Sequence, residues 1–484
     1  MDKIKELLTR RLPEGSFLRN VATLMTGTVL AQALTVLTSP LLTRIYSPDN
    51  YGILSLFISI MAVLAIIAGW RYELAIVLPE KDEDAANLLV LSILIAFGMG
   101  ILTLIAVAVF HQQAARLLNA PELDSWLWLL PISLFLAGLF QAFNYWSTRR
   151  KQFGRLAVRQ ITQSTVTVAS QITAGLVTQP VAGGLIGGSV LGQLAATSRL
   201  GWQIAVEDGR LIREKFKIGE IKKLAVNYKN FPIYSSWSAL LNSLSAMLPS
   251  LMLGYFFNTA VVGYYALGQK ILSLPMGVVG NSIAQVFFPR AADAQREGNL
   301  SQLAMNTFNK LLNLGLVPIL LISLVAPDLF SFIFGSKWLA AGQYVRWLSP
   351  WFLFVFIASP ISTLYDVLGR QRDGLIFNTL LLISRIVVLW LGGRTGNDQF
   401  TIALFGITGT VFWIFNCFWL LWIAGNKLLP AVRELLRAIF IAVPYIILPL
   451  VCIIFGLNAI IQISAAIIAG IVFSYRLIPH LQTK

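Results

Sequence analysis

Length, composition and charge exclude most classes of protein. The chain has 484 residues, of which 57% are hydrophobic and 12% are charged, and its mean hydropathy is +0.73, whereas an ordinary soluble domain is about 25% charged. A soluble enzyme is therefore excluded, and the net charge of +15 is explained by cytoplasmic loops that face anionic lipid better than by nucleic-acid binding.

Apolar segments that could cross a bilayer recur along the whole chain. A membrane-spanning helix needs roughly 20 apolar residues, and the apolar runs centre approximately on residues 30, 60, 98, 135, 168, 193, 244, 272, 320, 355, 383, 412, 446 and 466. We expect an all-α polytopic membrane protein with about fourteen transmembrane helices. The first run has no small-residue cleavage site after it, so it is expected to be a permanent span rather than a signal peptide.

Basic residues are distributed unevenly between the two sides of these predicted spans. With the N-terminus inside, 29 of the 37 Lys and Arg residues fall at cytoplasmic ends and loops. Four others lie within or at the edges of spans, and only four fall outside, at Arg44, Arg116, Lys337 and Arg394. The positive-inside rule therefore predicts that both termini are cytoplasmic.

The longest hydrophilic stretch, residues 207–231, separates six spans from the rest. The segment PLLTRIYSPDNYGILSL before it is echoed by PSLMLGYFFNTAVVGYYAL after it, with Gly52 and Gly263 in corresponding places. A duplicated unit would give this pattern. We expect two six-helix lobes related by a pseudo-two-fold axis along the membrane normal. The predicted divisions are an N-terminal lobe (1–206), a basic cytoplasmic linker (207–231), a C-terminal lobe (232–424) and two additional helices (425–484).

The turn between the first two spans carries a helix-start signal. Ser47 suits the N-cap position, Pro48 the first helical position, and Asp49 the positive end of the helix dipole. The sequence therefore predicts a tight turn on the outer side, after which the second span begins.

Polar side chains recur at helical spacing inside several apolar runs. They are Thr28, Gln32, Thr35 and Ser39 in the first span; Gln141 and Asn144 in the fourth; Gln160, Gln163, Ser164, Thr167 and Gln171 in the fifth; and Ser235, Ser238, Asn242 and Ser245 in the seventh. Hydrogen bonds between helices explain the Ser and Thr residues. Amides are costlier to leave unpaired in lipid, which favours a water-filled cavity between the lobes. The candidate cavity amides are Gln32, Asn144, Gln163, Gln171 and Asn242.

The sixth span instead carries glycines at helical spacing. Gly184, Gly188 and Gly192 lie on one face, which lets a neighbouring backbone approach closely. We interpret them as packing residues, because no phosphate-binding lysine follows.

Positive charge within the spans is the most specific signal for a binding site. Lys270 lies near the middle of the eighth span and Arg385 near the middle of the eleventh, and neither has a carboxylate three or four residues away on its own helix. A cation at that depth costs about 2.5–3.5 kcal/mol on insertion scales. We expect each to meet an anion or water; the alternatives are snorkelling and pairing with an acid on another helix.

Two further cations stand at the cytoplasmic ends of the first two spans. Arg19 and Arg71 are candidate substrate-binding residues, although anchoring at the membrane interface explains them equally well. Glu73 lies two residues from Arg71 and could pair with it.

The chain offers no constellation of catalytic or metal-binding residues. His111 and His480 are far apart in the sequence, and Cys417 and Cys452 lie within apolar runs, as packing residues do. We predict that the protein is not an enzyme and uses no cofactor or metal.

Several segments together resemble a known family. RNVATLMTGTVLAQALTVLTSPLLTRIYSPDNYG, GWRYELAIVLPEKDEDAANLL, FNYWSTRRKQFGRLAVRQI and ALLNSLSAMLPSLMLGYFFNTAVVGYYALGQKILSLPMGVVGNSIAQVFFPRAA resemble the Wzx-type oligosaccharide flippases. These bacterial polysaccharide exporters belong to the superfamily of multidrug, oligosaccharidyl-lipid and polysaccharide exporters. The resemblance covers roughly the first 370 residues. Relatives usually have an acidic residue where Asn50 stands, and the change weakens a capping box at Ser47.

The resemblance implies a V-shaped pair of six-helix lobes around a cavity that opens alternately to either side of the bacterial inner membrane. It implies that the substrate is an undecaprenyl-pyrophosphate-linked oligosaccharide repeat unit, translocated for lipopolysaccharide O-antigen or exopolysaccharide biosynthesis. Lys270 and Arg385 would then meet the pyrophosphate, and the amides would meet the sugars. Membrane lipid, a coupling ion (proton or sodium), and a polysaccharide polymerase with its chain-length regulator are the other partners that this function would use.

Two other functions fit parts of the pattern. A multidrug or small-solute antiporter of the same superfamily would have the same fold, but cationic drugs call for carboxylates within the spans, where this chain has basic residues. A membrane-bound polysaccharide polymerase or ligase would need a large outside loop, and the predicted outside loops are short.

Overall fold

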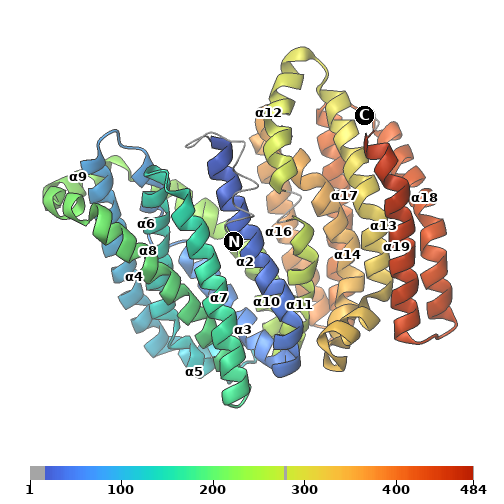
Figure 1. Cartoon of the computed structure of the whole chain (residues 1–484), viewed down its shortest axis with the longest axis horizontal. Coiled ribbons are helices and arrows are strands. Elements are labelled where there is room, and N and C mark those ends of the chain that lie inside the picture. Colours follow the sequence, from blue (N-terminus) through green and yellow to red (C-terminus); the bar gives the residue numbers. More distant parts are fainter. Residues whose placement is uncertain (1–16, 277–280, 483–484) are drawn as a thin grey trace. The chain divides into compact units, whose positions relative to one another are not determined.

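The computed structural model describes residues 17–276 and 281–482, with side chains described between Met25 and Arg476 except at a few positions between 275 and 285. In these ranges the chain folds into helices joined by short turns (Figure 1). The helices up to the second echoed turn are α2 (Phe17–Ile45), α3 (Pro48–Ala65), η1 (Tyr72–Val77), α4 (Asp82–Leu117), α5 (Leu123–Leu127), α6 (Leu130–Arg149), α7 (Phe153–Val177), α8 (Ala182–Lys215), α9 (Ile218–Asn227), η2 (Phe231–Ser235) and α10 (Ser236–Phe256). After that turn come α11 (Thr259–Pro275), α12 (Asn281–Glu297), α13 (Leu300–Phe334), η4 (Ser336–Trp338), α14 (Leu339–Ile361), α15 (Leu364–Val367), α16 (Gln371–Gly393), α17 (Asp398–Ile423), α18 (Leu428–Ile454) and α19 (Ala459–Gln482).

These helices confirm the all-α, polytopic fold class. Each of the fourteen predicted span centres falls inside a different helix. In the described part of the chain, 11 segments are long and apolar enough to cross a membrane. The three predicted spans outside this set are α7, which is rich in hydroxyls and amides, α8, which is rich in glycine, and α11, which has only 17 residues.

The chain divides into two compact units, one ending at Val262 and the other beginning at Gly263. The predicted linker, residues 207–231, is largely helical, because α8 continues to Lys215 and α9 follows at once. The first unit also includes α10, which packs against α3. The predicted lobe boundaries and the pseudo-two-fold relation stay predictions.

The predicted turn after the first span is confirmed. The Ser47 side chain caps α3 by accepting a hydrogen bond from the backbone N–H of Asn50 at 3.2 Å, with Pro48 and Asp49 in the first turn. The two echoed turns also touch within the first unit, where the Thr259 hydroxyl donates to the Asp49 carboxylate at 2.6 Å. A Cβ on Gly52 would lie 1.7 Å from the Thr259 carbonyl oxygen, so glycine is required there.

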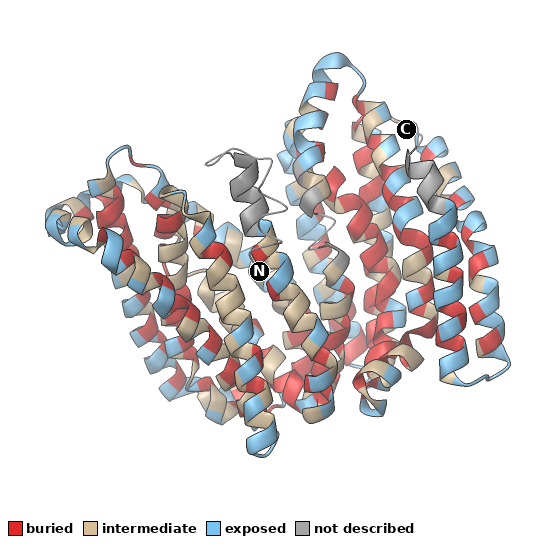
Figure 2. Cartoon of the chain, in the orientation of Figure 1, coloured by how far each residue is buried: buried red, intermediate tan, exposed pale blue. Residues whose placement is uncertain are grey.

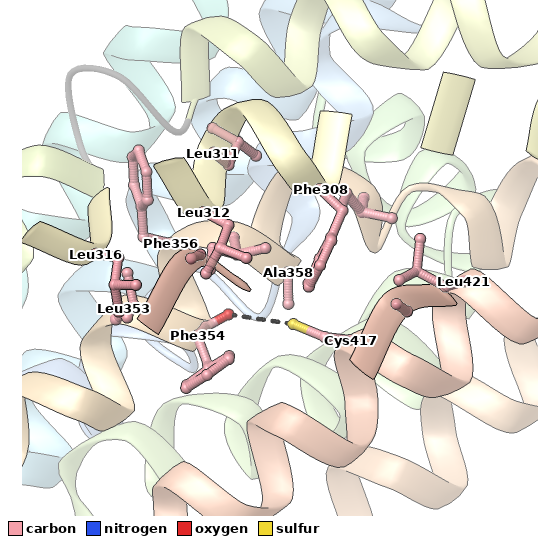
Figure 3. Packing of buried hydrophobic residues seen from close by; sticks show 14 of the residues in the cluster. Phe308, Leu311, Leu312, Leu316, Leu353, Phe354, Phe356, Ala358, Cys417 and Leu421 are labelled. Atoms are coloured by element: carbon pink, nitrogen blue, oxygen red, sulfur yellow. Dashed lines mark hydrogen bonds between the residues drawn. The ribbon is translucent and has the colours of Figure 1, made fainter. Parts of the chain in front are cut away.

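In the second unit, the predicted additional helices α18 and α19 pack on α13. They extend a core that includes α13, α14 and α17, whose side chains Phe308, Leu312 and Leu421 are buried (Figures 2 and 3). Cys417 lies inside this core, and its thiol donates to the Phe354 carbonyl at 3.7 Å. The prediction that it is a packing residue is confirmed.

Candidate functional site

The polar faces of the first unit serve in part to hold helices together. The Thr28 hydroxyl of α2 donates to the Gln160 amide oxygen of α7 at 2.9 Å. The buried Gln171 amide donates to the Leu185 carbonyl at 2.9 Å and to the Ser189 hydroxyl at 3.2 Å, both on α8. Gln171 was predicted as a cavity residue, but in this structure its amide nitrogen makes the interhelical hydrogen bonds that the alternative explanation required.

The glycine face of α8 explains how α7 comes so close. A Cβ on Gly188 would lie 2.6 Å from the Gln171 side chain, and one on Gly192 would lie 1.9 Å from the Thr167 hydroxyl. These contacts confirm the predicted packing role, and they fix the face of α7 that carries its amides.

The other candidate amides remain open to a ligand. Gln32, Asn144 and Gln163 are partly exposed and Asn242 is exposed. Among the described residues, none of these four side chains forms a hydrogen bond with another protein group. Their exposure is compatible with a wet surface, and the expected cavity itself stays a prediction.

Arg71 follows a sharp backbone reversal after α3. Trp70 and Arg71 both have left-handed backbone angles, φ 49° and 63°, which bulky residues rarely adopt. Because of this reversal, η1 begins at once and packs into the core formed with α4 and α6. Arg71 is thereby brought within electrostatic range of Glu73 and of Tyr145 on α6.

Glu73 itself is buried, with an exposed fraction of 1%. Neither of its carboxyl oxygens accepts a hydrogen bond from another residue, and in the described part of the chain it forms no ion pair with Arg71. The suggested Arg71–Glu73 pair is therefore not formed. Burial raises the pKa of the Glu73 carboxyl, because it disfavours the charged form, although the positive charge of Arg71 opposes the shift.

One cation of the first unit, Arg159, was not among the predicted site residues. Arg159 of α7 was grouped with the cytoplasmic basic residues, yet its guanidinium lies over the Phe140 ring of α6, 3.4 Å from the ring centroid. It stands four residues before Gln163, so both side chains lie on one helical face. The four-residue spacing from Gln163 was the sequence pattern that could have identified Arg159 as a candidate.

Four other charged groups near the same end of the unit are tied together. Arg150 donates to Asp82 at 2.9 Å and to Asp208 at 2.6 Å, while Arg149 also reaches Asp82 at 2.9 Å. The buried Asp208 accepts a further bond from the Trp146 indole at 2.9 Å. This network joins α4, α6 and α8 and is best understood as structural.

In the second unit, Arg385 lies in a small pocket between α14, α16 and α17. The pocket is lined by Trp351, Leu381, Ser384, Arg385, Val388, Phe405, Thr408 and Gly409. The Arg385 guanidinium is 5.5 Å from the Trp351 ring centroid, a cation–π distance. The buried indole N–H of Trp351 has no acceptor among the described residues, and Arg385 brings positive charge to the lining of this pocket.

Lys270 lies on α11 of the same unit and is partly buried. Its predicted depth within a membrane span and its role as a substrate ligand stay predictions. The side chains of Arg19 and His480 lie outside the described residues.

The sequence of this chain is similar to those of proteins named for polysaccharide biosynthesis. A family model described as "Polysaccharide biosynthesis protein" matches residues 41–343. The succinoglycan biosynthesis transport protein ExoT of Rhizobium meliloti (strain 1021) is 25% identical over 374 residues, which is 75% of this chain and 70% of that protein. The teichuronic acid biosynthesis protein TuaB of Bacillus subtilis (strain 168) is 23% identical over 172 residues, 35% of this chain and 36% of that protein.

Solved structures show the same fold. The lipid II flippase MurJ in an inward closed conformation matches with a TM-score of 0.68 at 13% identity, covering 95% of this chain and 99% of that one. An inward-facing multidrug resistance transporter of the MATE family matches with a TM-score of 0.65 at 15% identity, covering 87% and 98%.

Proposed function

The chain belongs to the polysaccharide biosynthesis protein family, and we propose from this that it is a flippase for lipid-linked oligosaccharides. Its substrate would be an undecaprenyl-pyrophosphate-linked repeat unit for lipopolysaccharide O-antigen or exopolysaccharide. The protein would carry it across the bacterial inner membrane by alternating access, with both of its own termini in the cytoplasm. No bond of the substrate is made or broken.

The observation that carries this proposal is the position of two cations, Lys270 and Arg385, within apolar helices of a member of this family. A pyrophosphate carries concentrated negative charge, and Arg and Lys bind it by charge-assisted hydrogen bonds. In the second unit the Arg385 guanidinium lies over the ring of Trp351, so a cationic group with several hydrogen-bond donors lines that pocket. Such donors suit a phosphate oxygen and repel a cationic drug, which favours the flippase over the antiporter.

The sugar part of the substrate needs neutral groups that both donate and accept hydrogen bonds. Gln32, Asn144 and Gln163 are amides of this kind, and the structure leaves them partly exposed. Arg159 and Arg71 add positive charge in the same unit. The relatives' names support this assignment, since one names succinoglycan biosynthesis transport and the other teichuronic acid biosynthesis.

The test is a complementation experiment in a strain that lacks the chromosomal copy. Lys270→Ala and Arg385→Ala are each expected to reduce polysaccharide export and to raise the level of lipid-linked repeat units, while membrane insertion stays normal. Arg210→Ala is the matched control, because the Arg210 side chain is 91% exposed. If the protein were instead a membrane polymerase, the same variants would change the chain length of the exported polymer.

Normal export in both the Lys270 and Arg385 variants would remove the anion-site assignment. Accumulated substrate is measured as lipid-linked sugar extracted from membranes, and protein abundance is measured by immunoblot of the same fractions. A deletion that lowers drug resistance without altering lipid-linked sugar would favour the antiporter.

A further inference from the structure

Helix α8 is longer than a bilayer requires. Its 34 residues extend about 51 Å at 1.5 Å per residue, whereas the hydrocarbon core is about 30 Å thick. Its C-terminal part must therefore leave the hydrocarbon, and α9 begins immediately after it. Apolar side chains are nevertheless exposed along this end, with Trp202 at 73% and Val206 at 67%.

Hydrogen bonds to α4 and η1 fix the depth of α9. The Asn87 amide nitrogen of α4 donates to the Lys215 carbonyl at 3.0 Å, and its oxygen accepts from the Lys217 backbone N–H at 3.0 Å. The Tyr72 hydroxyl donates to the Ala225 carbonyl at 2.9 Å, near the other end of α9. Asn87 precedes the centre of its span by eleven residues, about 16 Å, which places α9 at the edge of the hydrocarbon.

Two apolar side chains of α9 stay exposed beside its lysines, as occurs in a helix that lies in the membrane interface. Ile221 and Leu224 are buried against the first unit. Ile218 and Val226 are exposed at 65% and 63%, and with Lys222 they form one stripe at spacings of four residues. An interfacial helix buries such apolar side chains at the boundary of headgroups and acyl chains, while its lysines extend to the headgroups.

The charge at this surface is positive. Lys217, Lys222 and Lys223 are all exposed. Among their described acidic neighbours, Glu220 forms only a long surface pair with Lys223, at 3.5 Å, and Glu83, which lies within electrostatic range of Lys217, is paired with Lys215. Polybasic segments next to a membrane attract anionic lipid. The exposed side chains of this segment combine three lysines with two apolar residues, which suits an anionic lipid layer better than a soluble partner.

We propose that α9 is an interfacial helix that binds anionic phospholipid headgroups through Lys217, Lys222 and Lys223, with Ile218 and Val226 in the acyl boundary. The binding site lies in the segment that joins the sixth and seventh predicted spans. It does not depend on which substrate the protein carries, because none of these residues belongs to the proposed substrate site.

The depth of α9 is tested by spin labelling the full-length protein in lipid nanodiscs. Val226→Cys is labelled with a nitroxide, and Asn227→Cys, on another side of α9, is the matched control; Cys417 and Cys452 are buried and are replaced by alanine. We expect oxygen to relax the label at 226 more than a water-soluble nickel chelate does, and the reverse at 227. Preference of both labels for the nickel chelate would refute the interfacial position.

Lipid selectivity is tested in nanodiscs of phosphatidylcholine with phosphatidylglycerol, by measuring the phosphatidylglycerol that stays bound to the detergent-extracted protein. The double variant Lys222→Gln/Lys223→Gln is expected to bind it about 25-fold more weakly, which is about fivefold for each lysine. The control Lys310→Gln/Lys427→Gln changes net charge equally at two exposed lysines of the other unit. An equal loss in the control would refute a local site, and displacement of the lipid by inorganic phosphate would refute a site held in the membrane.

Discussion

Gly52→Ala tests the contact between the two echoed turns. The added Cβ would lie 1.7 Å from the Thr259 carbonyl oxygen and 2.6 Å from its carbon. Both are backbone atoms, so the start of α11 must move and the Thr259–Asp49 hydrogen bond must lengthen. Overpacking of this kind costs about 1–3 kcal/mol, and the greater helix propensity of alanine returns about 0.5–1 kcal/mol. We expect a net loss of about 1–2 kcal/mol.

The matched control is Gly98→Ala in α4, where a Cβ would meet nothing within 4 Å. The same chemical change there should leave stability equal or slightly higher. The assay is the apparent melting temperature of the purified protein in detergent, followed by the fraction that stays monodisperse after heating. A loss of 1 kcal/mol corresponds to about 2–4 °C for a unit of this size. If Gly52→Ala melts at or above the temperature of Gly98→Ala, the close contact does not exist as described.

Substitutions at three other positions test particular hydrogen bonds and charges. Asp208→Ala should lower stability by about 1–3 kcal/mol in the same melting assay, because it leaves the buried Trp146 N–H without an acceptor, whereas Asp208→Asn should cost less; equal losses would contradict this account. Tyr46→Phe removes the bond from its hydroxyl to the Gln171 carbonyl at 2.8 Å and should cost about 0.5–1.5 kcal/mol, and an unchanged melting temperature would show that the bond contributes nothing. Glu73 has a raised pKa because it is buried, so the folded state holds its proton more strongly than the unfolded state does. The stability that this provides is complete below the ordinary glutamate pKa of about 4.3 and is lost as pH rises through the raised value. Glu73→Gln should therefore flatten the fall in melting temperature with rising pH, and an identical pH profile would refute the role of Glu73.

Sequence periodicity was sufficient for the elements themselves. Fourteen apolar runs predicted fourteen helices, because a chain in lipid must satisfy its backbone hydrogen bonds within each span. The start of α3 was equally predictable, since capping at Ser47 involves only residues that are close in sequence. The glycine face of α8 was recognised for the same reason.

The function of individual polar residues depended on tertiary contacts. Gln171 and Gln163 share one helix and one residue type, yet only Gln171 donates to the neighbouring helix α8. Glu73 was expected beside Arg71 and is instead buried without that partner, and Arg159 was counted among cytoplasmic charges although it lies over a ring of α6. A helical period fixes which side chains share a face, but it cannot specify which neighbour that face meets. That neighbour lies on another helix, so only the packed structure could separate the residues that hold helices together from those without such a contact.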